Sequence, residues 1–212
     1  MKKNKIHDIS LSIYPGMLKW PDDPPIQFSS FASMARGDKV NLNLLIMGSH
    51  TGTHIDAPFH FQKKGKKIDT IPLDILVGQA LVVQVSSGCI SLKDVKNIDY
   101  NQYKRILFKT KNSRFLKKKK FRTDYVYLDY PAACFLVKKG VKVIGIDYLS
   151  IEKYGSADHK VHKILTRNNV IIIEGLDLSR IKPKDYLLMA LPLKIKKGDG
   201  SPCRVALIEG VL

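Results

Sequence analysis

Three of the six histidines lie within eleven residues, together with one carboxylate. These side chains belong to His50, His54, Asp56 and His60, at offsets of 0, 4, 6 and 10. Because side chains of an extended segment alternate between two faces, even offsets would place all of them on one face. A helix would turn Asp56 about 200° away from His54, and Pro58 would interrupt it. The spacing therefore predicts an extended segment that gathers its polar groups on one side.

Imidazole and carboxylate groups in this combination suit zinc, manganese or iron. The alternative is a chance cluster on a loop, since a single histidine is most often a packed or surface residue. Here the polar groups share one predicted face and stand among glycine, threonine and proline residues. We therefore favour a metal site in residues 50–60.

Two later positions could complete such a site. His159 and His162 lie three residues apart on a predicted helix, so both could face the same way. Glu174 follows the apolar run Val170-Ile171-Ile172-Ile173. A glutamate at a strand end is most often exposed. A carboxylate at the edge of a hydrophobic core, however, is usually paired with an opposite charge or bound to a metal.

Length and composition fit one ordinary globular domain over residues 1–212. The chain has 212 residues, of which 44% are hydrophobic, enough to bury one sizeable core. No apolar run is long enough for a membrane helix, and the basic start has no apolar stretch behind it, so we expect no signal peptide. The cysteines Cys89, Cys134 and Cys203 are odd in number and far apart, which favours reduced, buried thiols in a cytoplasmic protein.

The net charge of +17 raises the question of a polyanionic partner. Lys and Arg side chains neutralise phosphates, so a nucleic acid or an anionic membrane is one interpretation. However, ten of these residues lie between Lys104 and Arg122, including the run 117–120. Such a run is typical of a solvated, mobile loop, and few aromatic residues interleave with it as a stacking platform would require. We therefore do not favour nucleic acid or membrane as a partner.

The elements that must position these residues are mainly strands. Alternating and continuous apolar patterns predict strands over 6–14, 26–33, 40–47, 81–85, 105–110, 124–129, 141–146, 170–174, 186–193 and 204–209. Capping and stop signals predict helices over 91–98, 131–139 and 157–165. The pattern predicts an α/β fold, a single mixed and mostly β domain with covering helices. Phosphate-binding glycine loops and the G-x-S-x-G elbow of serine hydrolases do not occur in the sequence.

A proline-rich loop over residues 15–25 carries Trp20, the only tryptophan. Its prolines and Gly16 exclude a helix. Trp20 could pack on the core, or it could form one wall of a ligand pocket, since loops on a rigid scaffold often carry such residues. The spacing alone leaves both interpretations open.

As a motif, residues 50–60 read H-x-G-T-H-x-D-x-P-x-H, and in this form they resemble the signature of the metal-dependent cyclase family. That family contains bacterial kynurenine formamidases (arylformamidases) and isatin hydrolases. The resemblance extends over almost the whole chain, through Asp8-Ile9-Ser10, the Pro-Gly-x-x-x-Trp-Pro loop, the stretch from His162 to Glu174-Gly175-Leu176, and Leu191–Lys194 with Gly200–Arg204. It implies a swivelling β/α/β cyclase-like fold. The basic stretch 104–122 departs from the family pattern and resembles an insertion or a diverged loop.

The resemblance also implies a centre of two divalent metal ions, with Zn²⁺ as the first candidate and Mn²⁺ as the alternative. His50 and His54 would hold one ion and His162 the other, while Asp56 and Glu174 would bridge or share them. The spacing of twelve residues between His162 and Glu174 matches the family pattern.

The same resemblance assigns roles to three further residues and suggests an assembly. His60 would be the catalytic acid–base residue, and Trp20 would line the substrate pocket. His159 would then lie behind a metal ligand or at the surface. A homodimer or larger homo-oligomer is implied, as is a small-molecule substrate.

Three functions remain open at this stage. The first is an arylformamidase that converts N-formyl-L-kynurenine to L-kynurenine and formate, a step of tryptophan catabolism by the kynurenine pathway. A metal ion that lowers the pKa of a bound water would supply the attacking hydroxide, and His60 would protonate the departing nitrogen. The second is a hydrolase of a cyclic amide such as isatin. The third is a basic nucleic-acid-binding protein with a structural metal.

Overall fold

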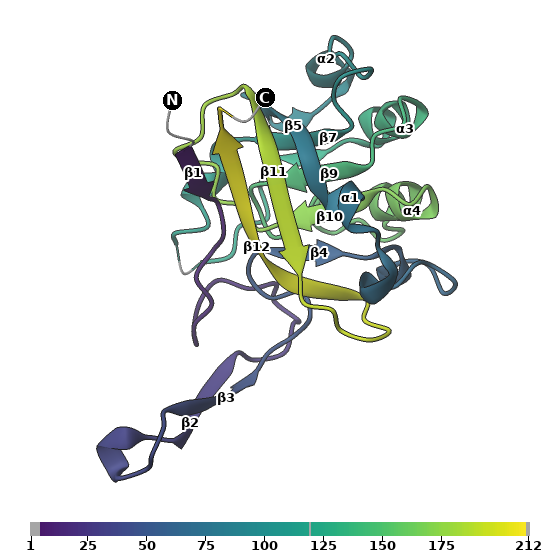
Figure 1. Cartoon of the computed structure of the whole chain (residues 1–212). Coiled ribbons are helices and arrows are strands. Elements are labelled where there is room, and N and C mark those ends of the chain that lie inside the picture. Colours follow the sequence, from purple (N-terminus) through teal and green to yellow (C-terminus); the bar gives the residue numbers. More distant parts are fainter. Residues whose placement is uncertain (1–4, 119, 211–212) are drawn as a thin grey trace.

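The computed structural model describes residues 5–118 and 120–210, and it forms a mixed α/β fold in which strands dominate (Figure 1). The main sheet has the strand order β1-β12-β11-β5-β7-β9-β10-β4. These strands are β1 (Lys5–Asp8), β4 (His54–Asp56), β5 (Val77–Gln84), β7 (Arg105–Lys109), β9 (Val143–Ile146), β10 (Ile171–Glu174), β11 (Asp185–Pro192) and β12 (Gly200–Glu209). The fold class expected from the sequence is confirmed.

The sheet closes on itself because the long strand β12 pairs with more than two neighbours. Its first residues pair with β4, its middle with β11 and its end with β1. Strands β5, β7, β9 and β10 are mutually parallel, whereas β4 is antiparallel to both β10 and β12. The short strand β4 is therefore held along both edges.

In the described residues, four α-helices connect or cover these strands (Figure 1). They are α1 (Leu73–Leu76), α2 (Leu92–Val95), α3 (Tyr130–Lys138) and α4 (Lys160–Arg167). The side chain of Asp129 caps α3 by accepting from the Ala132 amide, and Ser91 with Asp94 forms the capping box of α2. Short 3-10 helices cover Met34–Arg36, Pro58–His60, Ile68–Thr70 and Lys111–Arg114.

The run 170–173, which leads through strand β10 to Glu174, is apolar at every position because it is buried on both faces. Ile171 and Ile173 point into the interior of the barrel, while Val170 and Ile172 pack in a second core together with residues of α3 and α4. A strand buried on both faces reads as a continuous hydrophobic run. The alternation also fixes the direction of Glu174, which lies on the same side as Ile172.

A hairpin of β2 (Gln27–Ala32) and β3 (Leu42–Ile46) projects away from the rest of the molecule (Figure 1). None of its strand residues is buried. Exposed apolar side chains occur along it and at its turn: Phe28, Phe31, Met34, Val40, Leu42, Leu44, Leu45 and Ile46. A second small sheet pairs β6 (Cys89–Ile90) with β8 (Tyr127–Leu128).

In the basic stretch from Lys104 to Arg122, the strand predicted over 105–110 is present, whereas the expectation of a solvated, mobile loop is wrong for the segment 111–116 that follows it. Arg105–Lys109 is a central strand of the sheet. Asn112 is fully buried, and its side-chain amide pairs with both backbone groups of Val126. Leu116 is buried as well.

Several predicted boundaries shift in the structure. The first strand ends at Asp8 instead of residue 14, and α4 begins at Lys160 instead of residue 157. The cysteines are free thiols, as expected, but they are only partly buried. In the described part of the chain, no helix has the length and apolar character needed to span a membrane.

Candidate metal centre

Strand alternation sets three polar side chains on the outer face of the barrel. Ile55 of β4 lies opposite Ile173 of β10, and both enter the barrel core. Their neighbours His54 and Asp56, and Glu174 opposite His54, therefore face the other way. His54 Nε2 lies 3.3 Å from Asp56 Oδ1 and 3.6 Å from Glu174 Oε2.

His50 reaches the same place from a turn before β4. Gly52 has a φ of +67°, a left-handed conformation that glycine adopts readily, and there the chain reverses. His50 Nδ1 then lies 2.8 Å from Asp56 Oδ1. His54 Nδ1 donates to the Gly52 carbonyl at 3.0 Å. Since a carbonyl only accepts, that bond leaves His54 Nε2 facing the carboxylates.

Helix α4 brings His162 to the cluster. Its Nε2 lies 3.4 Å from Glu174 Oε1 and 4.0 Å from Asp56 Oδ2. On the opposite side of the ring, Nδ1 donates to Glu152 Oε2 at 2.6 Å. Of the two histidines near this helix, His162 joins the cluster, while the side chain of His159 is 52% exposed.

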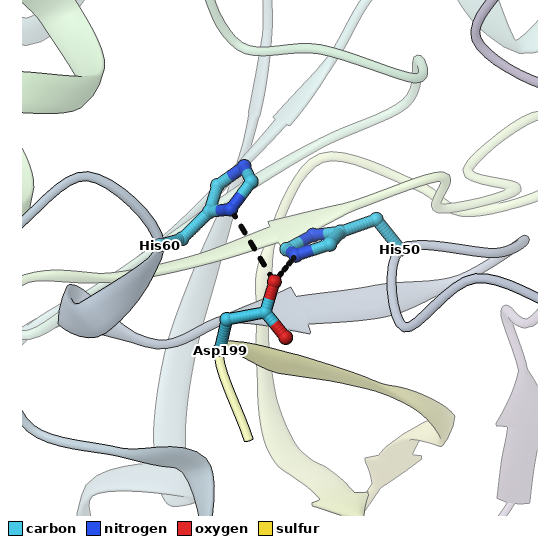
Figure 2. A group of neighbouring side chains, drawn as sticks. All are labelled: His50, His60 and Asp199. Carbon is cyan, nitrogen blue, oxygen red and sulfur yellow. Dashed lines mark hydrogen bonds and ion pairs between the residues drawn. The ribbon is translucent and has the colours of Figure 1, made fainter. Parts of the chain in front are cut away.

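His60 stands at the rim, on the 3-10 helix that begins at Pro58. Its ring lies against the ring of His50, with centroids 3.9 Å apart. Figure 2 shows that both rings point toward Asp199, whose Oδ2 is 3.1 Å from His50 Nε2 and 3.7 Å from His60 Nδ1. Asp199 immediately precedes Gly200, the first residue of β12. A Cβ added at Gly200 would lie 2.6 Å from His50 Cε1.

The prediction that residues 50–60 form one extended segment is therefore wrong. Only His54–Asp56 is a strand. The turn at Gly52 and the 3-10 helix after Pro58 fold the two ends back. The four side chains still converge, because the bends bring together the groups that a straight strand would have spread along its length.

The cluster lies in a cavity of about 490 Å³. Trp20 forms part of its wall, with its ring 5.1 Å from Phe121 and 5.7 Å from Tyr154, centroid to centroid. Trp20 thus packs on other aromatic rings and also lines the cavity, so its role in binding a ligand stays a prediction. Every predicted site residue lines this cavity: Trp20, His50, His54, Asp56, His60, His162 and Glu174.

The charges in the cluster depend on one another. Burial raises the pKa of Glu174, and the neighbouring charge of Asp56 raises it further. Burial lowers the pKa of His50, but the charge and hydrogen bond of Asp56, together with Asp199, outweigh this effect and raise it to about 9. His162 behaves similarly: burial opposes its charge, but bonds to Glu152 and Glu174 raise its pKa to about 10.

His60 is shifted in the opposite direction. Burial lowers its pKa to about 4, and the positive charges of His50 and His162 contribute, although Asp56 acts against them. His60 is therefore neutral at pH 7 and can accept a proton.

The described residues contain four groups of donor atoms that could hold a cation, and two of these groups adjoin at Asp56. In the first, which we call the His50 site, atoms of His50, His54 and Asp56 lie within 4.8 Å of one another. In the second, the His162 site, the same holds for Asp56, His162 and Glu174. Asp56 belongs to both. Buried imidazole and carboxylate donors in this number suit zinc or manganese, so the residues fit a pair of divalent cations.

Sequence reasoning missed two residues of the centre. Glu152, bonded to His162, follows Ser150 in a segment with no recognisable pattern. Asp199 stands between Gly198 and Gly200, and nothing else in the sequence around it points to a site. A carboxylate flanked by two glycines is a weak signal for close approach to another group, and it is the only one that could have indicated Asp199.

Comparisons with known proteins agree with this architecture. The Cyclase family model, described as "Putative cyclase", matches residues 7–153. The kynurenine formamidase of Geobacillus thermodenitrificans is 37% identical over 201 residues, which cover 94% of this chain and 95% of the relative. That of Bacillus mycoides is 34% identical over 208 residues, covering 98% of this chain and 99% of the relative.

Solved structures give the same picture. One titled "The Structure Of Potential Metal-Dependent Hydrolase With Cyclase Activity" has a TM-score of 0.85 and 33% identity, and covers 99% of this chain and 100% of that chain. Isatin hydrolase A from Labrenzia aggregata matches with a TM-score of 0.84 at 20% identity, and the match covers 97% of this chain and 93% of that chain. At this identity, the match shows similarity of fold alone.

The fold and its relatives define a class of hydrolytic enzymes built on this closed, strand-rich sheet. Within that class, the chain belongs to the Cyclase family, because the family model covers more than half of it and the relatives match it over nearly their full length.

Metal binding at this centre should tighten as the pH rises from 6 to 8. The pKa values of His50 and His162, about 9 and about 10, lie above the ordinary 6.5, so both rings hold protons at neutral pH in the metal-free protein. A cation must displace these protons, and each one displaced changes the affinity about tenfold per pH unit. Zinc titration calorimetry in buffers of different ionisation enthalpy measures both effects. An affinity independent of pH, without proton release, would contradict this.

Proposed function

We propose that this protein is a metal-dependent amide hydrolase that converts N-formyl-L-kynurenine to L-kynurenine and formate. The observation that carries the proposal is the convergence of two cation sites on the shared carboxylate of Asp56, beside a neutral His60 and an aromatic cavity wall. Relatives named kynurenine formamidase, 34% and 37% identical over nearly the whole chain, support the choice of substrate.

Two divalent cations would be held by the residues already described, with zinc as the first candidate and manganese as the alternative. His50, His54 and Asp56 would hold one, and Asp56, His162 and Glu174 the other. When bound, such cations supply Lewis acidity, which activates water as a nucleophile and polarises the carbonyl of the formamide. The mixed imidazole and carboxylate donors do not distinguish zinc from manganese.

The proton transfers fall to His60. Its Nδ1 faces Asp199, which leaves Nε2 to exchange a proton with the reactants. Neutral at pH 7, His60 takes a proton as water adds to the formyl carbon. It then gives this proton to the nitrogen as the C–N bond breaks, so that the aromatic amine leaves neutral and formic acid remains, which loses its proton to the solvent and becomes formate. A low pKa makes protonated His60 a strong acid for that second step.

Trp20 would bind the aromatic ring of the substrate. It lines the cavity beside Phe121 and Tyr154, and these rings hold it in place. Stacking on an aromatic substrate contributes about 0.5–1.5 kcal/mol beyond the area buried. This wall is the reason to prefer an aryl formamide over an aliphatic one.

Activity assays test the proposal directly. We expect zinc-loaded protein to hydrolyse N-formyl-L-kynurenine with a higher kcat/KM than isatin, and chelation to abolish the reaction until zinc is restored. His60→Gln should lower kcat about 10²- to 10⁴-fold with unchanged zinc content, whereas His54→Ala should lose zinc as well. His7→Gln, far from the cavity at Glu209, is the matched histidine control. Full activity after complete chelation, or in His60→Gln, would refute the scheme.

We also propose that the protein forms a homodimer through the β2–β3 hairpin. Both faces of this hairpin are exposed and apolar, with Phe28 beside Leu45 on one face and Leu44 on the other. A two-stranded hairpin is marginally stable alone in water, and its strands carry no charged residue. A second copy of the same uncharged surface would cover it.

Charged substitutions in the hairpin should produce monomers. Leu44→Glu and Leu45→Glu place a charge on opposite faces, so at least one should dissociate the dimer in sedimentation equilibrium. Leu73→Glu on α1, at a site 61% exposed, is the control and should leave the assembly unchanged. A wild-type monomer, or dimers in both hairpin variants, would rule out this interface.

A further inference from the structure

The three imidazoles of the two cation sites share one arrangement. Each has one ring nitrogen toward the carboxylates of Asp56 or Glu174 and bonds a fixed acceptor through the other nitrogen. The acceptors are the Gly52 carbonyl for His54, Asp199 for His50 and Glu152 for His162. Such outer partners fix the tautomer and the orientation of a ligand histidine. Of the two carboxylate acceptors, Asp199 is half-exposed, whereas Glu152 is buried.

Glu152 is held more firmly than any other acceptor of the set. Its Oε1 accepts from Ser156 Oγ at 2.9 Å and from the Val161 amide at 3.1 Å. Its Oε2 accepts from His162 Nδ1 at 2.6 Å and from the His162 amide at 3.2 Å. The side chain is 4–5% exposed. Because every partner donates, the carboxyl group is ionised, and it fixes both the backbone and the ring of the same histidine.

We propose that Glu152 is a positioning residue that sets the tautomer and orientation of His162 and thereby the affinity of the His162 site for its cation. With Nδ1–H directed to Glu152, the only nitrogen left for a cation is Nε2, which already lies between Glu174 Oε1 and Asp56 Oδ2. The inference rests on the metal centre of the proposed function and concerns how one half of it is built.

Two other roles for Glu152 compete with this one. It could bind a cation itself, since Glu152, His159 and His162 form a further group of nearby donor atoms. However, both of its oxygens are occupied by strong donors, and His159 is largely exposed, 4.0 Å away. Glu152 could also serve only to cap the start of α4. The experiment must separate positioning from both roles.

The test is zinc binding to metal-free full-length protein, measured by titration with zinc chloride against a competing chelator. Wild type should bind two ions. Glu152→Gln keeps the size of the side chain but loses its charge and one acceptor. The affinity of the His162 site for zinc should therefore fall roughly 10- to 100-fold, while the affinity of the His50 site should change little. Glu152→Asp keeps the charge, so its affinity for zinc at the His162 site should lie between those of wild type and Glu152→Gln. Glu209→Gln makes the same change in a carboxylate that pairs with His7, far from the cavity, and should bind zinc as wild type does.

A double-mutant cycle with His162→Ala separates positioning from capping. If Glu152 acts through the ring of His162, then Glu152→Gln should not weaken zinc binding further once that ring is absent. If it only caps α4, its effect should persist in the His162→Ala background and should accompany a lower unfolding midpoint of the metal-free protein. The inference would be overturned if the losses of zinc affinity in the two single variants were additive, or if Glu152→Gln weakened both ions equally. Unchanged zinc binding in Glu152→Gln, or fewer than two ions bound by wild type, would overturn it as well.

The outcome is independent of the substrate. If wild type binds two zinc ions and the variants behave as described, the role of Glu152 stands even when N-formyl-L-kynurenine is not hydrolysed. If hydrolysis occurs but Glu152→Gln binds both ions normally, the proposed function stands and this inference fails.

Discussion

The buried carboxylate of Asp56 is the constraint on which the centre depends. It is 1% exposed, yet it is ionised, because His50 and His54 lower its pKa well below the ordinary value against the effect of burial. A buried charge that loses its partner destabilises a protein by about 3–5 kcal/mol. Positive charge must therefore stand on both sides of Asp56, supplied by protonated imidazoles in the metal-free protein or by cations in the loaded one.

The fold satisfies this constraint by immobilising the strand that carries Asp56. Strand β4 has only three residues, but it pairs with β10 on one edge and β12 on the other. Ile55 anchors it in the barrel core. Glycine at position 200 leaves room for the ring of His50, since a side chain there would collide with it. Short elements with both edges paired position side chains more accurately than loops do, which suits a site that needs several groups at fixed distances.

Much of this centre could be predicted from local sequence, because its central residues are close together in the chain. The even spacing of His54 and Asp56 predicted a shared face, and the apolar run before Glu174 predicted a carboxylate at the edge of a core. The first expectation rests on strand alternation and the second on the rarity of unpaired charges beside a core, and neither needs knowledge of the partner strands. The alternation in residues 26–33 and 40–47 likewise predicted two strands, but not that they would lack a core.

What escaped prediction depends on tertiary contacts. Glu152 meets His162 because the chain after β9 turns back before α4, and no periodic pattern marks that turn. Asp199 meets His50 across 149 positions in the sequence, through pairing of β12 with β4. The bends at Gly52 and after Pro58 replaced one straight strand, since glycine and proline allow several conformations that only the packed structure selects.

The central claim is that two cations share Asp56, and anomalous diffraction from crystals of the zinc-loaded protein tests it most directly. Data collected at the zinc absorption edge locate each ion without reference to activity. We predict two peaks less than about 4 Å apart, one among His50, His54 and Asp56 and the other among Asp56, His162 and Glu174. A single peak, or a peak bound by Glu152 and His159 instead, would contradict it.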